Sequence, residues 1–557
     1  MSPATGGGDT PLSIGVDYGT ESGRVLILDL VSGEELGIAT VPYRHGVIDR
    51  ELPGSGAALP PDWALQHPSD YLEVLTEGIP AALSASGVDP SRVIGIGLDF
   101  TSCTVLPCRS DGTPLCLEER FATRPHAWTK LWKHHAAQHV ADRLNEVAAE
   151  RNEAFLARYG GRISSEWYFP KLIQVFLEDR EVYDATDAFV EATDWVVWKL
   201  TGSLARSACA AGYKALWSAT DGLPPAVYFA QAVPGFDDPA AKLGRNFMEL
   251  GGRAGALQSP LAERLGLPAG IAVAVGNVDS FVSVPGCGVG EPGVFVSVVG
   301  TSICDMVVHR DEVLLEGITG VVRDGIVPGL YGYEAGQPAV GDMFAWYVDR
   351  LLGGSGARYG ELEAAAATLL PGESGLVALD WWNGNRSVLG DADLAGAVVG
   401  LSLQTTPSEL YRALLESVAY GARTIIENFE SGGMALARVV ACGGIAEKSE
   451  LMMQLFADVS GLDVEVAGSS QVPARGSALF GAVAAGRDAG GFADIATATA
   501  TLAVPAARTF KPNAEAKAVY DRVFALYRSL HDTLGRRDVG VMHELKALRR
   551  SQRAPGA

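Results

Sequence analysis

The sequence predicts an α/β fold built from two similar domains. Apolar strand-like runs separated by glycine turns alternate with helices that have one apolar face, which is typical of α/β domains. A hairpin with Gly19-Thr20 in its turn lies near the start, and a second hairpin with Gly300-Thr301 in its turn lies midway. In a chain of 557 residues, this repetition favours two large domains of one design.

The first half begins with three predicted strands. Residues 13–18, 23–30 and 35–42 are β-like runs separated by short turns, which predicts an antiparallel meander. Ser69 is expected to cap a helix that extends to Leu83, and the apolar run 93–98 predicts a buried strand. Strands followed by a helix in this order indicate an α/β domain.

The second half repeats strands and helices. Strands are predicted at 271–275, 293–301 and 303–308, and an amphipathic helix at 408–429 stops at Gly432. A strand over 438–444 runs into the turn Gly443-Gly444, and helices are expected over 449–459 and 513–530. A strand, a glycine turn and a helix in this order place backbone amides beside a nucleotide.

The chain is acidic and rich in apolar residues. Its formal net charge is −22, its sequence pI is about 4.9, and 48% of its residues are hydrophobic, with a mean hydropathy of +0.14. Sizeable cores are therefore expected, and this composition excludes a disordered or disulfide-stapled protein. The charge argues against nucleic acid and anionic membranes as partners, but not against a local anion site built from backbone amides.

Several common signals are absent from the sequence. There is no secretory signal and no run of about 18 apolar residues, so we expect a cytoplasmic protein that does not cross a membrane. The seven cysteines contain no CxxC pair and are expected to be reduced thiols without a zinc cluster. No Gly-Lys pair exists, which excludes a Walker A loop, and His134-His135 is interpreted as a surface pair.

Residues 17–24 follow the first strand and carry polar groups. Asp17 closes the strand, Thr20 and Ser22 supply hydroxyls in a tight turn, and Arg24 follows. Such a set can hold a metal, donate to phosphate oxygens and neutralise charge on a transferring phosphoryl group. The alternative is an ordinary hairpin with polar turn residues.

Asp279 ends another apolar run. An aspartate held near a metal and a substrate hydroxyl can act as a general base, although helix N-capping is the commoner role for such a residue. One carboxylate and one Gly-Thr turn from each half would meet at an interdomain cleft, which is the arrangement that an ATP-dependent kinase requires.

These motifs, in this order, resemble the FGGY family of carbohydrate kinases over about residues 13–530. The resemblance implies two actin-like, ribonuclease-H-like ATPase domains with a cleft between them. Within the family, the chain is most similar to the members that phosphorylate L-ribulose. The segments that carry this similarity are 99–104, 127–133, 211–214, 276–279, 331–337 and 441–446.

The resemblance also implies site residues. Asp279 would be the general base, Arg24 would stabilise transferring charge, and Asp17 would hold Mg²⁺. Nucleotide contacts would come from the two Gly-Thr turns and from later glycine turns, namely Thr20, Ser22, Gly300, Thr301, Gly341, Gly443, Gly444, Lys448 and Ser449. The sugar would contact Ser102, Trp128, Lys214, Asp279 and Glu334.

The expected reaction converts L-ribulose and ATP to L-ribulose 5-phosphate, a step of L-arabinose breakdown. The alternatives are a kinase for xylulose, ribitol or glycerol, and an actin-like nucleotide switch without sugar kinase activity. The predicted divisions are a lead-in at 1–12, a sugar-binding domain at 13–270, a nucleotide-binding domain at 271–535 and a solvated tail at 536–557. Relatives are often dimers, so the resemblance is compatible with a homodimer.

Overall fold

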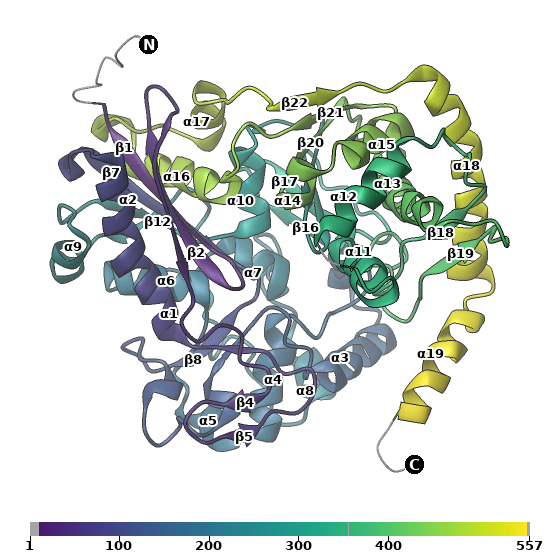
Figure 1. Ribbon diagram of the computed structural model, residues 1–557. Coiled ribbons are helices and arrows are strands. Elements are labelled where there is room, and N and C mark those ends of the chain that lie inside the picture. The colour runs from purple at the N-terminus through teal and green to yellow at the C-terminus, as the bar shows by residue number, and fades with distance from the viewer. Residues whose placement is uncertain (1–9, 355, 554–557) are drawn as a thin grey trace, which may run out of the picture.

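The computed structural model describes residues 10–354 and 356–553, and it has two lobes that each contain a seven-stranded sheet (Figure 1). The first sheet has the order β11-β12-β7-β1-β2-β3, with β13 also paired to β7. Its strands are β1 (Leu12–Tyr18), β2 (Ser22–Asp29), β3 (Glu35–Pro42), β7 (Val93–Phe100), β11 (Arg253–Ala256), β12 (Ala272–Ala274) and β13 (Asn277–Val278).

The second sheet has the order β16-β17-β15-β14-β20-β21-β22. Its strands are β14 (Val294–Val299), β15 (Ile303–His309), β16 (Gly320–Arg323), β17 (Tyr331–Gln337), β20 (Arg438–Cys442), β21 (Asp463–Val466) and β22 (Arg508–Phe510).

The two sheets share one topology. The path β3-β2-β1-β7-β12-β11 has antiparallel, antiparallel, parallel, parallel and antiparallel pairs. The path β17-β15-β14-β20-β21-β22 has the same sequence of pairings. The prediction of two similarly built α/β domains is therefore confirmed, and the predicted meander corresponds to β1, β2 and β3.

One helix from late in the chain packs on the first sheet. A Cβ atom on Gly15 of β1 would lie 1.7 Å from the carbonyl oxygen of Ala474, and one on Gly97 of β7 would lie 1.9 Å from that of Ser477. Both contacts belong to α16 (Val472–Ala485), which therefore lies backbone against backbone on this sheet. The other face is covered by α2 (Ile79–Ser86) and the turns before it, where Gly78 meets Val25.

The helix α10 (Asp279–Gly286) packs closely on α16. A Cβ on Gly286 would lie 2.1 Å from the Val472 carbonyl oxygen, and a Cβ on Gly476 would lie 2.1 Å from that of Val282. These reciprocal glycine contacts bring the two helices together between the lobes. Asp279, at the start of α10, is positioned by this packing.

The second lobe is built around α13 (Pro407–Ser431), which confirms the helix predicted at 408–429. It begins at a capping box in which the Thr406 side chain accepts from the Glu409 backbone and the Glu409 side chain accepts from the Thr406 backbone. Its Phe429 ring lies edge-on to Tyr333 of β17 at 6.0 Å between centroids. The other helices of this lobe are α11 (Gly341–Ala345), α12 (Gly356–Ala367), α14 (Gly444–Lys448), α15 (Glu450–Ser460) and α18 (Ala514–Asp532).

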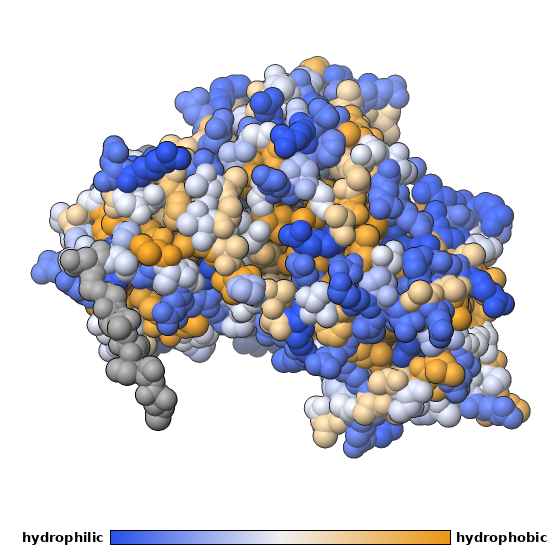
Figure 2. Space-filling model, turned by 90° about the horizontal axis from the view of Figure 1, so that it is seen from above, coloured by the Kyte–Doolittle hydropathy of each residue, from blue (hydrophilic) through white to orange (hydrophobic). Residues whose placement is uncertain are grey.

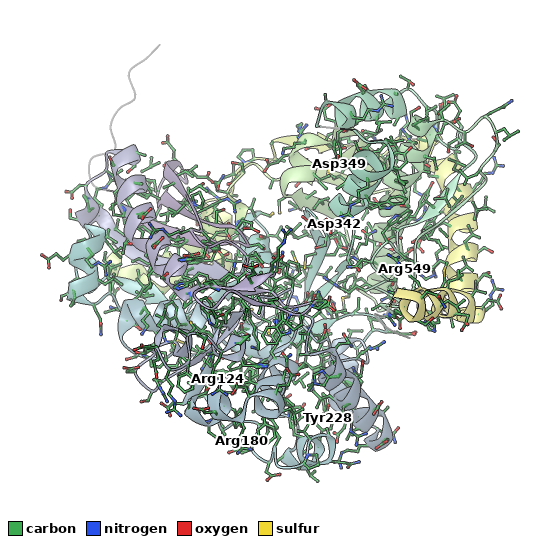
Figure 3. All side chains as sticks on the ribbon, turned by 60° about the horizontal axis from the view of Figure 1, so that its bottom comes forward. Arg124, Arg180, Tyr228, Asp342, Asp349 and Arg549 are labelled. Atoms are coloured by element: carbon green, nitrogen blue, oxygen red, sulfur yellow. The ribbon has the colours of Figure 1, made fainter. Side chains whose placement is uncertain are left out.

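A helical subdomain extends the first lobe, at the bottom of Figure 1. It surrounds a small sheet with the order β10-β8-β9-β6, and Arg124, Arg180 and Tyr228 lie in it (Figure 3). Its strands are β6 (Leu65–Gln66), β8 (Val105–Cys108), β9 (Thr129–Lys130) and β10 (Ala188–Glu191). The nearby helices are α3 (Gln138–Arg151), α4 (Tyr168–Glu178), α5 (Arg180–Ala185), α6 (Ala192–Thr201), α7 (Ala208–Lys214) and α8 (Ala226–Ala232).

The structure corrects several predicted boundaries. α1 (Pro68–Glu73) is capped by His67, whose ring accepts from the backbone of Ser69, so Ser69 lies inside the first turn. β12 pairs with β7, so the predicted boundary between residues 270 and 271 cuts through the first sheet. An apolar run indicates a strand but not its sheet, which depends on long-range pairing.

The ends also differ from prediction. The predicted tail contains an ordered helix, α19 (Gly540–Arg553). Of the predicted lead-in, residues 1–9 lie outside the described residues and Leu12 already belongs to β1. His134 is fully buried rather than exposed, because its Nε2 lies 2.9 Å from the Gln174 side-chain oxygen in the subdomain core.

The outer surface mixes polar and apolar residues. Seen from above, hydrophilic side chains surround scattered apolar ones (Figure 2). Among the helices that the structure describes, none is long and apolar enough to cross a membrane.

Candidate active site

Three carboxylates meet where three strands of the first sheet end. Asp17 of β1 pairs in register with Asp99 of β7, and Asp99 pairs with Asn277 of β13. Asp279 follows two residues later as the first residue of α10. Parallel strands end at the same edge of a sheet, so these side chains are brought together by topology rather than by sequence proximity.

Asp99 is the most deeply buried of the three. Its side chain is 0% exposed, its Oδ2 accepts from the Ser477 hydroxyl at 2.6 Å, and its Oδ1 has no partner among the described residues. Burial raises the pKa of Asp99 well above its ordinary value, and the nearby charges of Asp17 and Asp279 raise this pKa further. An unpartnered buried carboxylate oxygen suits a site that receives a cation or a proton donor.

Asp279 has the properties of a general base. Burial raises its pKa to about 7, and the charge of Asp17 contributes in the same direction. The Ser280 backbone N–H donates to its Oδ1 at 2.7 Å and, like the ammonium of Lys214, partly opposes that rise. A carboxylate whose pKa lies near neutral pH can accept a proton from a hydroxyl more readily than an ordinary aspartate.

The raised pKa also predicts a stabilising effect of Asp279→Asn on the ligand-free protein. The folded wild-type protein keeps a proton on Asp279 up to about pH 7, whereas the unfolded chain releases it near 3.8. Wild-type stability therefore falls as pH rises through this interval, and the neutral variant lacks that loss. We expect the variant to melt a few degrees above wild type at about pH 8 and close to it at about pH 4.5, by scanning fluorimetry without Mg²⁺. If the variant melts below wild type at about pH 8, the pKa of Asp279 is not raised as proposed.

The first Gly-Thr turn is held by the residues around it. Gly19 N–H donates to the Ser22 carbonyl at 3.0 Å, and the Gln66 side chain donates to the Thr20 carbonyl at 2.7 Å. The Trp132 indole N–H donates to the Thr20 hydroxyl at 3.1 Å. Arg24 Nη1 lies 2.9 Å from Asp17 Oδ2. The structure therefore brings all four predicted residues of segment 17–24 to one edge of the sheet.

The second Gly-Thr turn meets the start of α11. Gly300 N–H donates to the Ser302 carbonyl at 3.0 Å, and Val340 N–H donates to the Thr301 carbonyl at 2.9 Å. Gly341 lies against the same turn, since a Cβ there would be 3.1 Å from the Gly300 carbonyl oxygen. Three of the predicted nucleotide residues are thus adjacent to one another.

The other predicted nucleotide residues surround α14. Gly443 has φ = 92°, and a Cβ there would lie 2.8 Å from the Val299 carbonyl oxygen, so glycine is needed for both reasons. A Cβ on Gly444 would meet no atom within 4 Å, and Lys448 is exposed. The Ser449 hydroxyl caps α15 and donates to Glu363 at 2.6 Å, so a nucleotide contact would compete with these bonds.

A buried ion pair joins the two lobes. Lys214 Nζ, at the end of α7, lies 2.8 Å from Glu334 Oε2 on β17, and both side chains are nearly inaccessible. Burial alone lowers the pKa of Lys214, but the Glu334 carboxylate outweighs burial and raises that pKa overall. This pair supplies one donor and one acceptor for a polar ligand between the lobes.

Ser102 supplies an unused hydroxyl near this region. Its oxygen is buried and has no hydrogen-bond partner within the described chain. The next residue, Cys103, has φ = 57°, and its carbonyl accepts from Lys171 Nζ at 2.7 Å. The same ammonium donates to the carbonyl of Leu131 at 2.8 Å. Lys171 therefore ties the Ser102 turn to the segment that carries Trp128 and fixes their relative positions.

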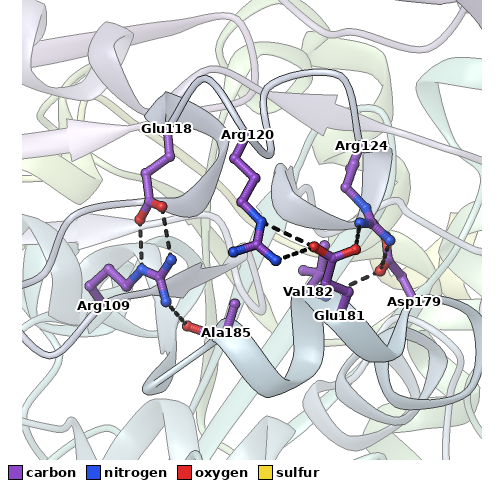
Figure 4. Close-up of polar contacts among 8 residues, drawn as sticks. All are labelled: Arg109, Glu118, Arg120, Arg124, Asp179, Glu181, Val182 and Ala185. Atoms are coloured by element: carbon purple, nitrogen blue, oxygen red, sulfur yellow. Dashed lines mark hydrogen bonds and ion pairs between the residues drawn. The ribbon is translucent and has the colours of Figure 1, made fainter.

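Trp128 is packed into the subdomain. It is 3% exposed, its indole N–H donates to the Ala122 carbonyl at 2.9 Å, and its ring lies 5.4 Å from that of His67. Ion pairs hold the loop that contains Ala122, with Arg124 2.6 Å from Asp179 (Figure 4). A stacking role toward a sugar stays a prediction, because most of the ring is covered here.

The comparisons with known proteins agree with this geometry. Sequence models of the FGGY family of carbohydrate kinases match residues 12–286 for the N-terminal domain and 295–485 for the C-terminal domain. The chain belongs to the FGGY family of carbohydrate kinases.

Relatives of this FGGY kinase include proteins named ribulokinase. That of Anoxybacillus flavithermus is 50% identical over 551 residues, which cover 97% of this chain and 98% of that protein. That of Mycolicibacterium smegmatis is 45% identical over 548 residues, covering 96% of each chain.

Solved structures share the fold. A xylulose kinase from Rhodospirillum rubrum has a TM-score of 0.75 at 23% identity, covering 94% of this chain and 98% of that one. Plasmodium falciparum glycerol kinase with ADP has a TM-score of 0.76 at 15% identity, covering 95% and 99%. The actin-like two-domain fold of this FGGY kinase is thereby confirmed.

Some residues at the site of this FGGY kinase were not predicted. Asp99 and Ser477 complete the carboxylate cluster, and Gln66, Trp132 and Lys171 hold the surrounding turns. Asp99 offered a signal, because it ends an apolar strand in the same way as Asp17. The other four act through contacts between distant segments, and no local pattern marks them.

Proposed function

We propose that this FGGY kinase transfers the γ-phosphoryl group of ATP to O5 of L-ribulose. The observation that carries the proposal is the buried Lys214–Glu334 ion pair, which lies near Asp279, an aspartate whose pKa is raised. The chain is also about 50% identical to proteins named ribulokinase. Lys214 is among the charges that shift the pKa of Asp279. A hydroxylated substrate bound to the ion pair would thus lie close to a base.

Asp279 takes the proton of the terminal hydroxyl as the oxygen attacks phosphorus. Its pKa of about 7 is suited to this transfer, and Arg24 balances negative charge on the transferring group. Lys214 donates to a sugar oxygen, Glu334 accepts from a sugar hydroxyl, and Ser102 supplies a further hydrogen bond. These groups orient O5, and closure of the lobes excludes water that would otherwise be phosphorylated.

The nucleotide lies between the two Gly-Thr turns and α14. The backbone amides of Thr301 and Gly444 are suited to phosphate oxygens, since they add positive dipoles without side-chain charge, whereas the Gly300 amide already donates to the Ser302 carbonyl. Asp17 would hold Mg²⁺, and the unpartnered oxygen of Asp99 fits a site that prefers carboxylate ligands. When bound, the ion neutralises charge on the β- and γ-phosphates.

The deciding experiment is an ADP-release assay over a panel of L-ribulose, D-ribulose, L-xylulose, D-xylulose, ribitol and glycerol. We expect the highest kcat/KM with L-ribulose and loss of that turnover in Asp279→Asn. Preference for xylulose, ribitol or glycerol would assign another substrate to the same site. ATP binding without any sugar-dependent turnover would instead favour an actin-like nucleotide switch.

A further inference from the structure

Arg386 is a half-buried arginine of the second lobe whose side chain has no partner in the protein. No hydrogen bond or ion pair joins its guanidinium to any other residue of the described chain. The buried arginines Arg412 and Arg475 instead donate to carboxylates and backbone carbonyls. A guanidinium has five N–H donors and no acceptor, and leaving it unpaired away from bulk water is costly. An arginine in this state is therefore suited to binding a ligand rather than to supporting the fold.

The loop that carries Arg386 is held in one conformation on both sides of this residue. The backbones of Asn385 and Asp391 exchange two hydrogen bonds of 2.8 Å. On the other side, the Gly336 backbone N–H of β17 donates to the Ser387 hydroxyl at 3.2 Å. Arg386 is thereby fixed beside β17, the strand that also carries Glu334 of the proposed sugar site.

The same loop faces the part of the first lobe that carries the other half of that site. A Cβ on Gly390 would lie 3.8 Å from the Gly160 carbonyl oxygen. The hydroxyl of the adjacent Tyr159 donates to the Gly212 carbonyl at 2.7 Å, and Gly212 lies on α7, two residues before Lys214. The loop and α7 therefore approach the same part of the interface between the lobes.

The charges around Arg386 indicate its place relative to the general base. Burial lowers the pKa of Arg386, but nearby acidic groups, of which Glu166 and Glu334 are two, outweigh burial and raise that pKa overall. After burial, the charges that shift the pKa of Asp279 include those of Lys214 and Glu334. The charges that shift the pKa of Lys214, after burial and Glu334, include that of Arg386. This pattern gives the order Asp279, then the Lys214–Glu334 pair, then Arg386.

We propose that Arg386 is a substrate-binding residue that donates to the oxygens on C1 and C2 of the ketose, an inference that rests on the proposed function. When O5 of L-ribulose meets Asp279 and its middle hydroxyls meet the Lys214–Glu334 pair, C1 and C2 point toward Arg386. A ketone oxygen accepts but cannot donate, which matches a guanidinium that donates but cannot accept. In ribitol a hydroxyl replaces the ketone, and its proton finds no acceptor on Arg386. Arg386 therefore favours a ketose over the corresponding polyol.

Steady-state kinetics with L-ribulose and ribitol test this assignment, because the two substrates differ only at C2. We expect Arg386→Met to raise KM for L-ribulose by about tenfold or more, with kcat within about threefold of wild type. The preference for L-ribulose over ribitol in kcat/KM should fall by about tenfold in the same variant. A residue that only supports the fold would weaken both substrates alike, so an unchanged preference overturns the proposal, as does an unchanged KM.

Two further variants complete the test. Arg323→Met is the matched control, since Arg323 lies on the neighbouring strand β16 with its side chain 54% exposed beside Asp324, and it should change neither KM nor the preference. Arg386→Lys keeps the cation but loses the paired donors, and it replaces the methionine variant if that one does not fold. We expect its preference to lie between those of wild type and Arg386→Met. A lysine variant that matches wild type overturns the proposal.

Calorimetric titration of L-ribulose without nucleotide separates this inference from the proposed function. We expect Arg386→Met to bind the sugar about tenfold more weakly than wild type. If wild type phosphorylates L-ribulose and Arg386→Met binds it equally tightly, the inference fails and the proposed function stands. If wild type neither binds nor phosphorylates L-ribulose, the proposed function fails and the inference fails with it.

Discussion

Replacing Asp279 by asparagine should lower kcat for sugar phosphorylation by about 10³-fold while leaving the affinity for nucleotide nearly unchanged. The amide keeps the shape of the side chain but cannot accept the proton of the sugar hydroxyl. In the proposed site, the nucleotide contacts come instead from the Gly-Thr turns and α14, to which Asp279 does not contribute. Steady-state kinetics and ADP titration would measure the two effects separately.

The matched control is Asp380→Asn. Asp380 is also a buried aspartate whose pKa is raised by burial, but its carboxylate accepts from Gln337 and Tyr527 inside the second lobe. We expect this variant to lose stability and to keep most of its kcat. An Asp279→Asn enzyme with near wild-type kcat would refute the assignment of Asp279 as the general base. Because this variant is expected to melt above wild type, a fall in its kcat can be attributed to the missing base rather than to unfolding.

The sequence was most informative where a local pattern fixes both structure and chemistry. Asp17 was singled out because it lies at the end of an apolar strand, Asp279 because it follows an apolar run, and Gly300 because it occupies a hairpin turn, whereas their assigned roles came from the family resemblance. The repetition of the hairpin predicted two lobes of one topology. In each case a few neighbouring residues determine the turn, so no distant contact had to be known.

The sequence was least informative where distant segments meet. β12 pairs with β7 in the first sheet, and α16 packs on that sheet from the far end of the chain. No local sequence pattern indicates either of these long-range contacts. Lys171 shows the same limit at the site, because a lysine in a helix normally extends into water, yet its ammonium donates to two loops.

The close approach of α16 to the first sheet predicts that Gly97→Ala is severely destabilising. The added methyl group would lie 1.9 Å from the Ser477 carbonyl oxygen, which is far inside van der Waals contact and involves rigid backbone on both sides. α16 would have to move away from β7, and its Ser477 would lose the 2.6 Å bond to Asp99. We expect a loss of about 3 kcal/mol or more in chemical denaturation, or failure to fold.

Two variants separate packing from hydrogen bonding in this prediction. Ser477→Ala removes the bond to Asp99 without a clash and should cost about 1–3 kcal/mol. Gly360→Ala adds a methyl group at an exposed position of α12, where it meets no atom within 4 Å, and should be neutral or slightly stabilising. If Gly97→Ala were as stable as Gly360→Ala, α16 could not lie on β7. Because α16 also contacts α10, the same methyl group should disturb Asp279, so activity should fall in any Gly97→Ala protein that does fold.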